Sequence, residues 1–233
     1  MLTNNFLNGP MKINSLKSFR IGFQLSHIGK AENVEEKNFE KPLVRVVRVF
    51  YGDHPNLPSV SIYFQGCDVL PKCIGCHNPE TWDFDNSYQI DLLYLLEKVN
   101  EKLTFLLTKY EKVALALIGG EPLSEKNRRS SYLIAKTIKE HFEDRVTTIV
   151  YSWRTPKQLL NINISLDYFD EFVLGKYKAE YRTDRFPASK NQLYINKKKL
   201  NVLLATLKKG AKKSFKNNLK RVDSTGKWGE VHV

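Results

Sequence analysis

The strongest constraint on this chain is the spacing of its three cysteines, which all lie in one short segment. Cys67, Cys73 and Cys76 form a C-x5-C-x2-C pattern within residues 66–84. Thiolates this close in the sequence can hold only one compact metal centre. A structural zinc site needs four protein ligands in a closed tetrahedron, and a cubane iron–sulfur cluster is usually held by four thiolates. Three cysteines would leave one iron of such a cluster open to bind a substrate or cofactor.

A zinc site remains an alternative because His77 could serve as a fourth ligand. This histidine directly follows Cys76, and adjacent residues rarely both point at one metal. Zinc modules also usually carry two separated pairs of ligands. The cysteine pattern alone therefore leaves three alternatives: a cluster held by three thiolates, a zinc site, and ordinary buried or redox-active thiols.

The composition is that of a soluble globular protein. Hydrophobic residues make up 42% of the 233 residues and charged residues 27%, which suits one sizeable core. The sequence contains neither an apolar run of membrane-spanning length nor a signal-peptide pattern. Closely spaced cysteines without distant partners argue against a disulfide framework. We therefore expect a cytoplasmic protein that does not associate with membranes.

The positive charge is concentrated near the C-terminus. The formal net charge is +12, and residues 190–233 contain twelve lysines and arginines against Asp223 and Glu230. Such a basic tail can be a solvated flexible end, a docking segment for an acidic partner, or a nucleic-acid contact. Nucleic acid is the weaker choice because only Phe215 and Trp228 interleave the lysines after Tyr194, which offers little for base stacking.

Apolar periodicity predicts an alternation of strands and helices from residue 42 onward. Ser87 is expected to cap the first long helix, and Thr155-Pro156 to begin a later one. A possible edge strand at residues 19–25 precedes this region. The predicted strands are residues 43–51, 59–65, 112–118, 146–151, 167–174 and 192–196, and the predicted helices are residues 88–110, 127–142 and 200–207.

This order of elements indicates an α/β fold. Strand–helix–strand units imply parallel pairing through right-handed crossovers, so we expect a partial, open β/α barrel with a predominantly parallel sheet. The cysteines follow the C-terminal end of a strand, which is where α/β folds build active sites. We divide the chain into an N-terminal extension (1–41), a central domain (42–196) and a basic C-terminal tail (197–233).

Several short motifs in the central domain resemble one family. They are Gly66-Cys67, the Cys73-x2-Cys76 pair, His-Asn-Pro-Glu-Thr-Trp at residues 77–82, Gly-Gly-Glu-Pro-Leu at 119–123, and Ala-Ser-Lys-Asn-Gln at 188–192. Together they resemble the radical S-adenosylmethionine (radical SAM) enzymes, specifically the activating proteins of anaerobic ribonucleoside-triphosphate reductase. The resemblance covers about residues 42–196. One departure is the first cysteine spacing, which is C-x3-C in that family, so that Leu70-Pro71 looks inserted here.

The resemblance implies a radical SAM type of partial barrel and a specific chemistry. Cys67, Cys73 and Cys76 would hold a [4Fe–4S] cluster whose open iron binds the amino and carboxylate groups of S-adenosylmethionine. Reductive cleavage would give methionine and a 5′-deoxyadenosyl radical, which takes a hydrogen from a glycine of a partner enzyme. The implied partners are the large subunit of anaerobic ribonucleotide reductase, a glycyl-radical enzyme, and a low-potential electron donor such as flavodoxin or ferredoxin.

The same resemblance suggests which residues contact the cofactor, with no catalytic side chain beyond the cluster ligands. Gly119 and Gly120 would let the backbone approach the methionine, and Glu121 would receive its ammonium group. Trp82 is expected to be a packing anchor, and Asn191-Gln192 either shape the mouth of the site or cap a turn. The cofactor-binding residues implied are Gly75, Cys76, His77, Gly119, Gly120, Glu121, Pro122 and Ser152.

Two other functions remain open at this stage. One is a radical SAM enzyme that acts on a small molecule, similar to 7-carboxy-7-deazaguanine synthase. The other, from a different class, is a basic nucleic-acid-binding module built on a Cys3His zinc site.

Overall fold

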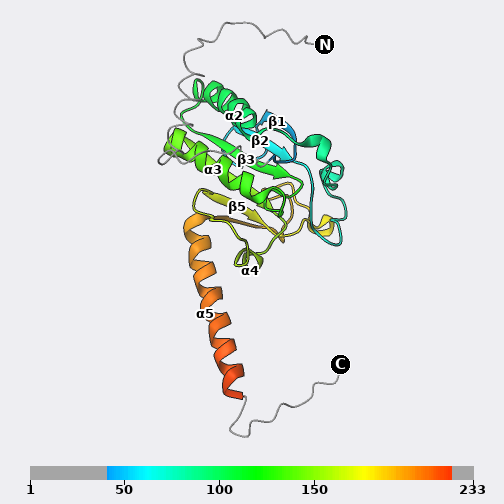
Figure 1. Ribbon diagram of the computed structural model, residues 1–233, viewed down its shortest axis with the longest axis vertical. Helices are drawn as coiled ribbons and strands as arrows, with labels where there is room; N and C mark the ends of the chain where they lie inside the picture. Colours follow the sequence, from blue (N-terminus) through cyan, green and yellow to red (C-terminus); the bar gives the residue numbers. More distant parts are fainter. Residues whose placement is uncertain (1–40, 222–233) are drawn as a thin grey trace, which may run out of the picture. The chain divides into compact units, whose positions relative to one another are not determined.

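The computed structural model describes residues 41–221, with side chains up to residue 210, and centres on one six-stranded sheet (Figure 1). The strands are paired in their sequence order. The predicted extension 1–41, with its possible edge strand at 19–25, lies outside the described residues except for Lys41. The strands are β1 (Val44–Phe50), β2 (Ser59–Phe64), β3 (Val113–Gly119), β4 (Val146–Ser152), β5 (Glu171–Leu174) and β6 (Leu193–Asn196).

The sheet is mixed rather than wholly parallel. Strands β2, β3, β4 and β5 pair in parallel, whereas β1 pairs antiparallel with β2 and β6 antiparallel with β5. The β1–β2 connection is too short for a crossover helix, so these two strands must run in opposite directions. The α/β class is confirmed, and the predominantly parallel sheet is confirmed only in part. Within the described residues the sheet does not close on itself, and its identity as a radical SAM barrel stays a prediction.

Helix α2 (Leu92–Leu107) packs its apolar stripe against β1, β2 and β3. Leu95, Val99 and Leu103 on this stripe are completely buried. The predicted N-cap, Ser87, was wrong: Asp91 caps the helix by accepting a 2.9 Å hydrogen bond from the backbone N of Tyr94. Asp91 directly precedes the first buried leucine, whereas Ser87 lies in a separate 3-10 turn, Asn86–Tyr88.

Three further helices follow the predicted order. Helix α3 (Arg128–Phe142) packs on β4 and contacts α2, and the two lie side by side in Figure 1. The expected N-cap at Thr155 is confirmed: a complete capping box begins α4 (Pro156–Leu159). The helix predicted at 200–207 is part of a longer one, α5 (Lys197–Arg221). Its sequence is rich in Lys and Leu, which favour helix, and contains no proline.

The parallel register brings the loops after four strands to one edge of the sheet. Phe64 at the end of β2 pairs with Gly119 at the end of β3, and Ser152 at the end of β4 pairs with Leu174 at the end of β5. The cysteine loop, the Gly119–Leu123 turn and the loops after β4 and β5 therefore meet there. No helix in the described part of the chain is long and apolar enough to span a membrane.

Candidate functional site

The cysteine loop leaves the end of β2 and is held at both ends by backbone hydrogen bonds. The N–H of Gly66 donates to Thr81 O (2.8 Å) and the N–H of Cys67 to Trp82 O (3.0 Å), so the segment that leaves the loop runs beside the segment that enters it. Lys72 stabilises the loop from inside, because its Nζ donates to the carbonyls of Cys67 and Trp82. The longer C-x5-C spacing is thus accommodated in an ordered loop.

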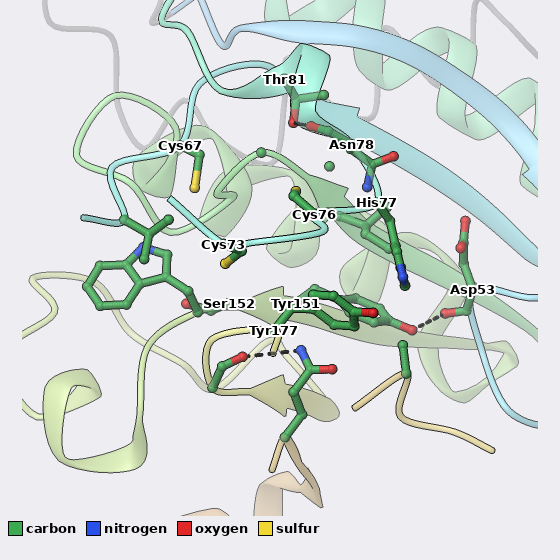
Figure 2. Close-up of a pocket in the computed structure, with 18 of the residues that line it drawn as sticks. Asp53, Cys67, Cys73, Cys76, His77, Asn78, Thr81, Tyr151, Ser152 and Tyr177 are labelled. Carbon is green, nitrogen blue, oxygen red and sulfur yellow. Dashed lines mark hydrogen bonds between the residues drawn. The ribbon is translucent and has the colours of Figure 1, made fainter. Parts of the chain in front are cut away.

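All three thiols are free and border one cavity of about 260 Å³. Figure 2 shows them on one side of this cavity and Asp53 on the other. Cys67 and Cys73 are buried, while Cys76 is half-buried. The remaining walls come from the carboxyl-terminal edge of the sheet and its loops, including Gly119, Gly120, Ser152, Trp153, Gly175 and Tyr177.

The surroundings of the thiols are apolar. Cys67 and Cys73 pack with Val69, and the rings of Trp82 and Trp153 lie against this group. Trp82 thus packs against the buried cysteines, as expected of a packing anchor, and it also borders the cavity. Burial raises the pKa of the Cys67 thiol to about 11, and burial followed by the neighbouring Cys76 raises that of Cys73. Such thiols are inert as nucleophiles but become metal ligands once a metal displaces their protons.

The donor set fits a cluster held by three thiolates. Three cysteines of one loop line a single cavity, and apolar side chains shield two of them from water. Within residues 41–221, no three His, Cys, Asp or Glu side chains converge closely enough to hold a single metal ion. A family model described as a 4Fe-4S single cluster domain matches residues 58–195, more than half of the chain.

The chain belongs to the 4Fe-4S single cluster domain family. The matched region of this 4Fe-4S single cluster domain runs from the residue before β2 to the last but one residue of β6 and includes all three cysteines and the Gly119–Leu123 turn. It supports an iron–sulfur cluster over the zinc and simple-thiol alternatives that the cysteine spacing left open. A comparison with curated proteins found no match.

Gly119 and Gly120 line the cavity, but their lack of side chains has a cause within the fold. A Cβ on Gly119 would lie 2.6 Å from the backbone N of Phe64, and one on Gly120 would lie 2.4 Å from the carbonyl O of Gly66. The turn also donates backbone hydrogen bonds to β2 and its loop, from Gly120 N to Phe64 O and from Glu121 N to Gly66 O, both 2.8 Å. The two glycines therefore let the turn pack against the base of the cysteine loop.

Glu121 occupies a different place from the one expected. Its side chain is 1% exposed and does not border the cavity. Oε1 accepts from the backbone N of Leu123 (2.9 Å) and lies 3.0 Å from Nη1 of Arg154, while Oε2 accepts from the backbone N of Trp153 (3.0 Å). Both oxygens are thus engaged within the protein, so this arrangement does not support a contact with an ammonium group of a ligand.

Burial dominates the electrostatics of Glu121. It raises the pKa of this carboxyl to about 7, even though Arg154 and the N–H of Trp153 act in the opposite direction. Pro122 is also buried away from the cavity, and its carbonyl accepts a 2.8 Å hydrogen bond from the Ser131 hydroxyl. Of the predicted turn residues, only the two glycines face the cavity.

Of the other predicted cofactor-binding residues, Ser152 and His77 border the cavity and Gly75 does not. Ser152 borders the cavity, and its Oγ accepts from the backbone N of Arg154 (3.1 Å). His77 is exposed, also borders the cavity, and contacts the Tyr177 ring in a tilted arrangement, with ring centroids 4.5 Å apart. Gly75 adopts φ 70° but does not border the cavity; a Cβ there would lie 3.1 Å from the Cβ of Ala179. The cofactor roles of all three stay predictions.

Several residues of the cavity were not predicted from the sequence. Asp53, Tyr151 and Phe186 border it, and the Tyr151 hydroxyl donates to the carbonyl of Asp53 (2.7 Å), as Figure 2 shows. The Asp53 carboxylate in turn accepts a 2.6 Å hydrogen bond from Tyr63. Burial raises the pKa of Tyr151, so this phenol stays protonated. The only sequence signal was the position of Tyr151 beside Ser152, at the end of a strand.

The segment at residues 188–192 contributes to the cavity through Gln192. Its Nε2 donates to Gly175 O (3.2 Å), and the residue borders the cavity. Asn191 is exposed and donates to Lys176 O (2.8 Å). Of the two residues expected to shape a mouth or cap a turn, Gln192 lies in the cavity wall and Asn191 joins two loop segments.

Proposed function

We propose that this protein is a radical SAM activase, which cleaves S-adenosylmethionine at a [4Fe–4S] cluster and generates a glycyl radical on a partner enzyme. The observation that carries the proposal is that three cysteines of one loop share a single cavity with Gly119 and Ser152, which end two other strands, and with Gly120, which follows Gly119. A cluster with three cysteine ligands keeps one iron open for another ligand.

Some residues of the site would hold the cluster, and others would shield it from water. When bound, the cluster would supply the electron that breaks a carbon–sulfur bond of the sulfonium. Cys67, Cys73 and Cys76 would hold it. The rings of Trp82 and Trp153, which pack against the buried cysteines, would keep water from the thiolates and from a reactive radical.

The opposite part of the cavity suits the group from which hydrogen is taken. Asp53, Tyr151 and Phe186 line it and come from the loop after β1, from β4 and from the segment before β6. Tyr151 and Asp53 hold each other by the hydrogen bond described above, so this wall is set before a substrate enters. We propose that a glycine-bearing loop of the large subunit of anaerobic ribonucleotide reductase enters here.

The setting that follows from this chemistry is a reducing one. Free thiols that must bind iron need a compartment such as the cytoplasm, which is the location we propose. A low-potential donor such as flavodoxin or ferredoxin would supply the electron. The basic C-terminal segment is compatible with an acidic protein partner.

The test is anaerobic reconstitution with iron and sulfide. The expected result is a brown protein whose reduced electron paramagnetic resonance (EPR) signal changes when S-adenosylmethionine is added, and which forms 5′-deoxyadenosine and methionine under a strong reductant. Cys73→Ala should lose the cluster. Ser87→Ala, in an exposed turn, serves as the control substitution.

The outcomes separate the alternatives. A colourless protein that retains zinc, or a brown one that never cleaves S-adenosylmethionine, would refute the proposal. If the reconstituted protein does cleave S-adenosylmethionine, addition of the ribonucleotide reductase large subunit should give a glycyl radical signal. Cleavage without that signal would refute the activase role and favour a radical SAM enzyme that acts on a small molecule.

A further inference from the structure

A second polar cluster lies behind the wall of the cavity and joins three loops that are distant in the sequence. Arg154, just after β4, lies between two carboxylates. Its Nη2 donates to Oδ2 of Asp68 (2.6 Å), and its Nη1 is 3.0 Å from Oε1 of Glu121. Asp68 directly follows Cys67 in the cysteine loop, and Glu121 belongs to the turn after β3. One guanidinium therefore connects the loops that follow β2, β3 and β4.

Trp153 also donates a hydrogen bond to each of the two carboxyl groups that Arg154 contacts. Its indole Nε1 donates to Oδ1 of Asp68 (2.7 Å), and its backbone N donates to Oε2 of Glu121 (3.0 Å). The guanidinium carbon of Arg154 also lies 4.8 Å from the centroid of the Trp153 ring. Each carboxylate is thus held by one contact from Arg154 and one from Trp153, an arrangement that fixes the orientation of the tryptophan ring.

Arg154 itself does not border the cavity, and its side chain is only 14% exposed. What borders the cavity are two residues that it holds: Cys67, next to Asp68, and Trp153, whose ring packs on the buried cysteines. An effect of Arg154 on a bound cofactor must therefore pass through these neighbours.

Without Arg154, Asp68 would lose its bond to the guanidinium and Glu121 would lose the cation beside it. Glu121 is almost completely buried, and a buried charge that loses its partner is strongly unfavourable. Nη1 of Arg154 is itself buried, and the group beside it is the Glu121 carboxyl, with Oε1 at 3.0 Å. Asp68, and with it Cys67, would no longer be tied through the guanidinium to the turn after β3.

We propose that Arg154 is a positioning residue: by bridging Asp68 and Glu121, it holds Cys67 and Trp153 in the places that cluster and cofactor binding require. The part that concerns S-adenosylmethionine rests on the proposed function, whereas the part that concerns Cys67 does not. Lysine could not replace this arginine fully, because a single ammonium lacks the fork geometry that spans two carboxylates.

The first experiment uses the cluster-free full-length protein. Arg154→Gln is compared with Arg145→Gln, which removes an exposed arginine at the opposite end of β4 whose Nη2 donates to Leu107 O. Alkylation of Cys67 by iodoacetamide is followed by peptide mass spectrometry. Because a buried thiol reacts through local opening, we expect Cys67 to react roughly tenfold faster in Arg154→Gln and at the wild-type rate in Arg145→Gln.

Asp68→Ala provides the second variant in case Arg154→Gln does not fold. It leaves the Arg154–Glu121 pair in place and removes a side chain that is 32% exposed, so folding should be retained. Cys67 should again react faster. In the double variant the two effects should not add, because both remove the same link. Wild-type reactivity of Cys67 in folded Asp68→Ala would overturn the proposal.

The second experiment uses the reconstituted protein and titrates S-adenosylmethionine against the EPR signal of the reduced cluster. We expect the half-saturating concentration to rise roughly tenfold in Arg154→Gln, as expected for a change of about 1.4 kcal/mol in binding, and to be unchanged in Arg145→Gln. Equal half-saturation in all three proteins would overturn the cofactor part. If the wild-type signal does not respond at all, the proposed function fails, while the alkylation result still decides the role of Arg154 toward Cys67.

Discussion

His54 and Glu171 lie 117 residues apart in the chain and are joined by a 3.0 Å hydrogen bond between Nε2 and Oε2. Nδ1 of His54 accepts from the backbone N–H groups of Asn56 and Leu57, so Nδ1 carries no proton and Nε2 is the donor. The same carboxylate oxygen of Glu171 accepts from the Tyr194 hydroxyl (2.7 Å). The histidine thus connects the β1–β2 loop, which carries Asp53, to the first residue of β5.

His54→Ala should therefore destabilise the protein. The substitution leaves two backbone donors and Glu171 without their partner in a site where the histidine is 5% exposed. We expect a loss of about 2–3 kcal/mol in the free energy of unfolding, measured by urea denaturation. His77→Ala is the control, because His77 is exposed and makes only a tilted ring contact with Tyr177 among the contacts described above, and it should cost less than about 0.5 kcal/mol. Equal losses for the two histidines would contradict this account.

Gly120→Ala tests the close packing of the turn after β3 against the cysteine loop. The new Cβ would lie 2.4 Å from Gly66 O and 2.9 Å from Thr81 O, and backbone atoms cannot rotate away as a side chain can. We expect a loss of about 2–4 kcal/mol in the free energy of unfolding, measured by thermal and urea denaturation.

Gly210→Ala is the matched control for that substitution. A Cβ at Gly210 meets no atom within 4 Å, and the residue lies inside α5, so alanine should favour the helix by about 0.5–1 kcal/mol. Circular dichroism should therefore show equal or greater helicity in Gly210→Ala. A stable Gly120→Ala protein with wild-type cluster content would show that the turn can move away from the loop.

The strands and the location of the site could be predicted because their signals are local. Apolar runs that end in Gly66-Cys67 and in Gly119-Gly120 mark strand ends, and parallel strands bring such ends together. The antiparallel β1 was also implied by its short connection to β2, although the alternation of elements suggested a parallel sheet.

The role of Glu121 could not be predicted in this way. A carboxylate at a strand end can face a cavity or the interior, and its partners here, Trp153 and Arg154, follow a different strand. The extent of α5 was underestimated for a different reason. Its first turns bury Leu200 completely, but beyond residue 207 the chain has few apolar residues, so hydrophobic periodicity gives no signal and only helix propensity remains.

Glu121→Gln should remove a pH dependence of stability. The folded protein holds the Glu121 proton up to a pKa of about 7, above the ordinary value of 4.5, so between these pH values the folded state binds more protons than the unfolded state. The free energy of unfolding should therefore fall as the pH rises through this window, by up to about 3 kcal/mol.

Urea denaturation of both proteins at several pH values isolates this contribution. As the pH rises from about 4.5 to 7, the free energy of unfolding of the wild type should fall relative to that of Glu121→Gln. Glu171 behaves in the opposite sense, because the hydrogen bond from His54 lowers its pKa, but it is present in both proteins and cancels. A difference that does not vary with pH would show that the Glu121 carboxyl ionises normally in the folded protein.

The three thiols should react with iodoacetamide at different rates in the cluster-free protein, and all three should be protected once the cluster is bound. Cys76 is half-buried, whereas Cys67 and Cys73 are each 8% exposed, and burial raises the pKa of Cys67 to about 11. At pH 8 the Cys67 thiol would therefore be almost entirely protonated. Iodoacetamide labelling of the cluster-free protein, read by peptide mass spectrometry, should therefore modify Cys76 first and Cys67 last. Faster labelling of Cys67 than of Cys76 would contradict the burial pattern.

Assembly of the cluster should depend on pH for the same reason. Iron binds thiolates, so each ligand must lose its proton, and reconstitution should become faster as the pH rises from 7 to about 9. Once the cluster is bound, all three cysteines should resist labelling together, because each has become an iron ligand. Protection of only two would mean that the third cysteine is not a ligand, and the longer loop between Cys67 and Cys73 would then have changed the ligand set.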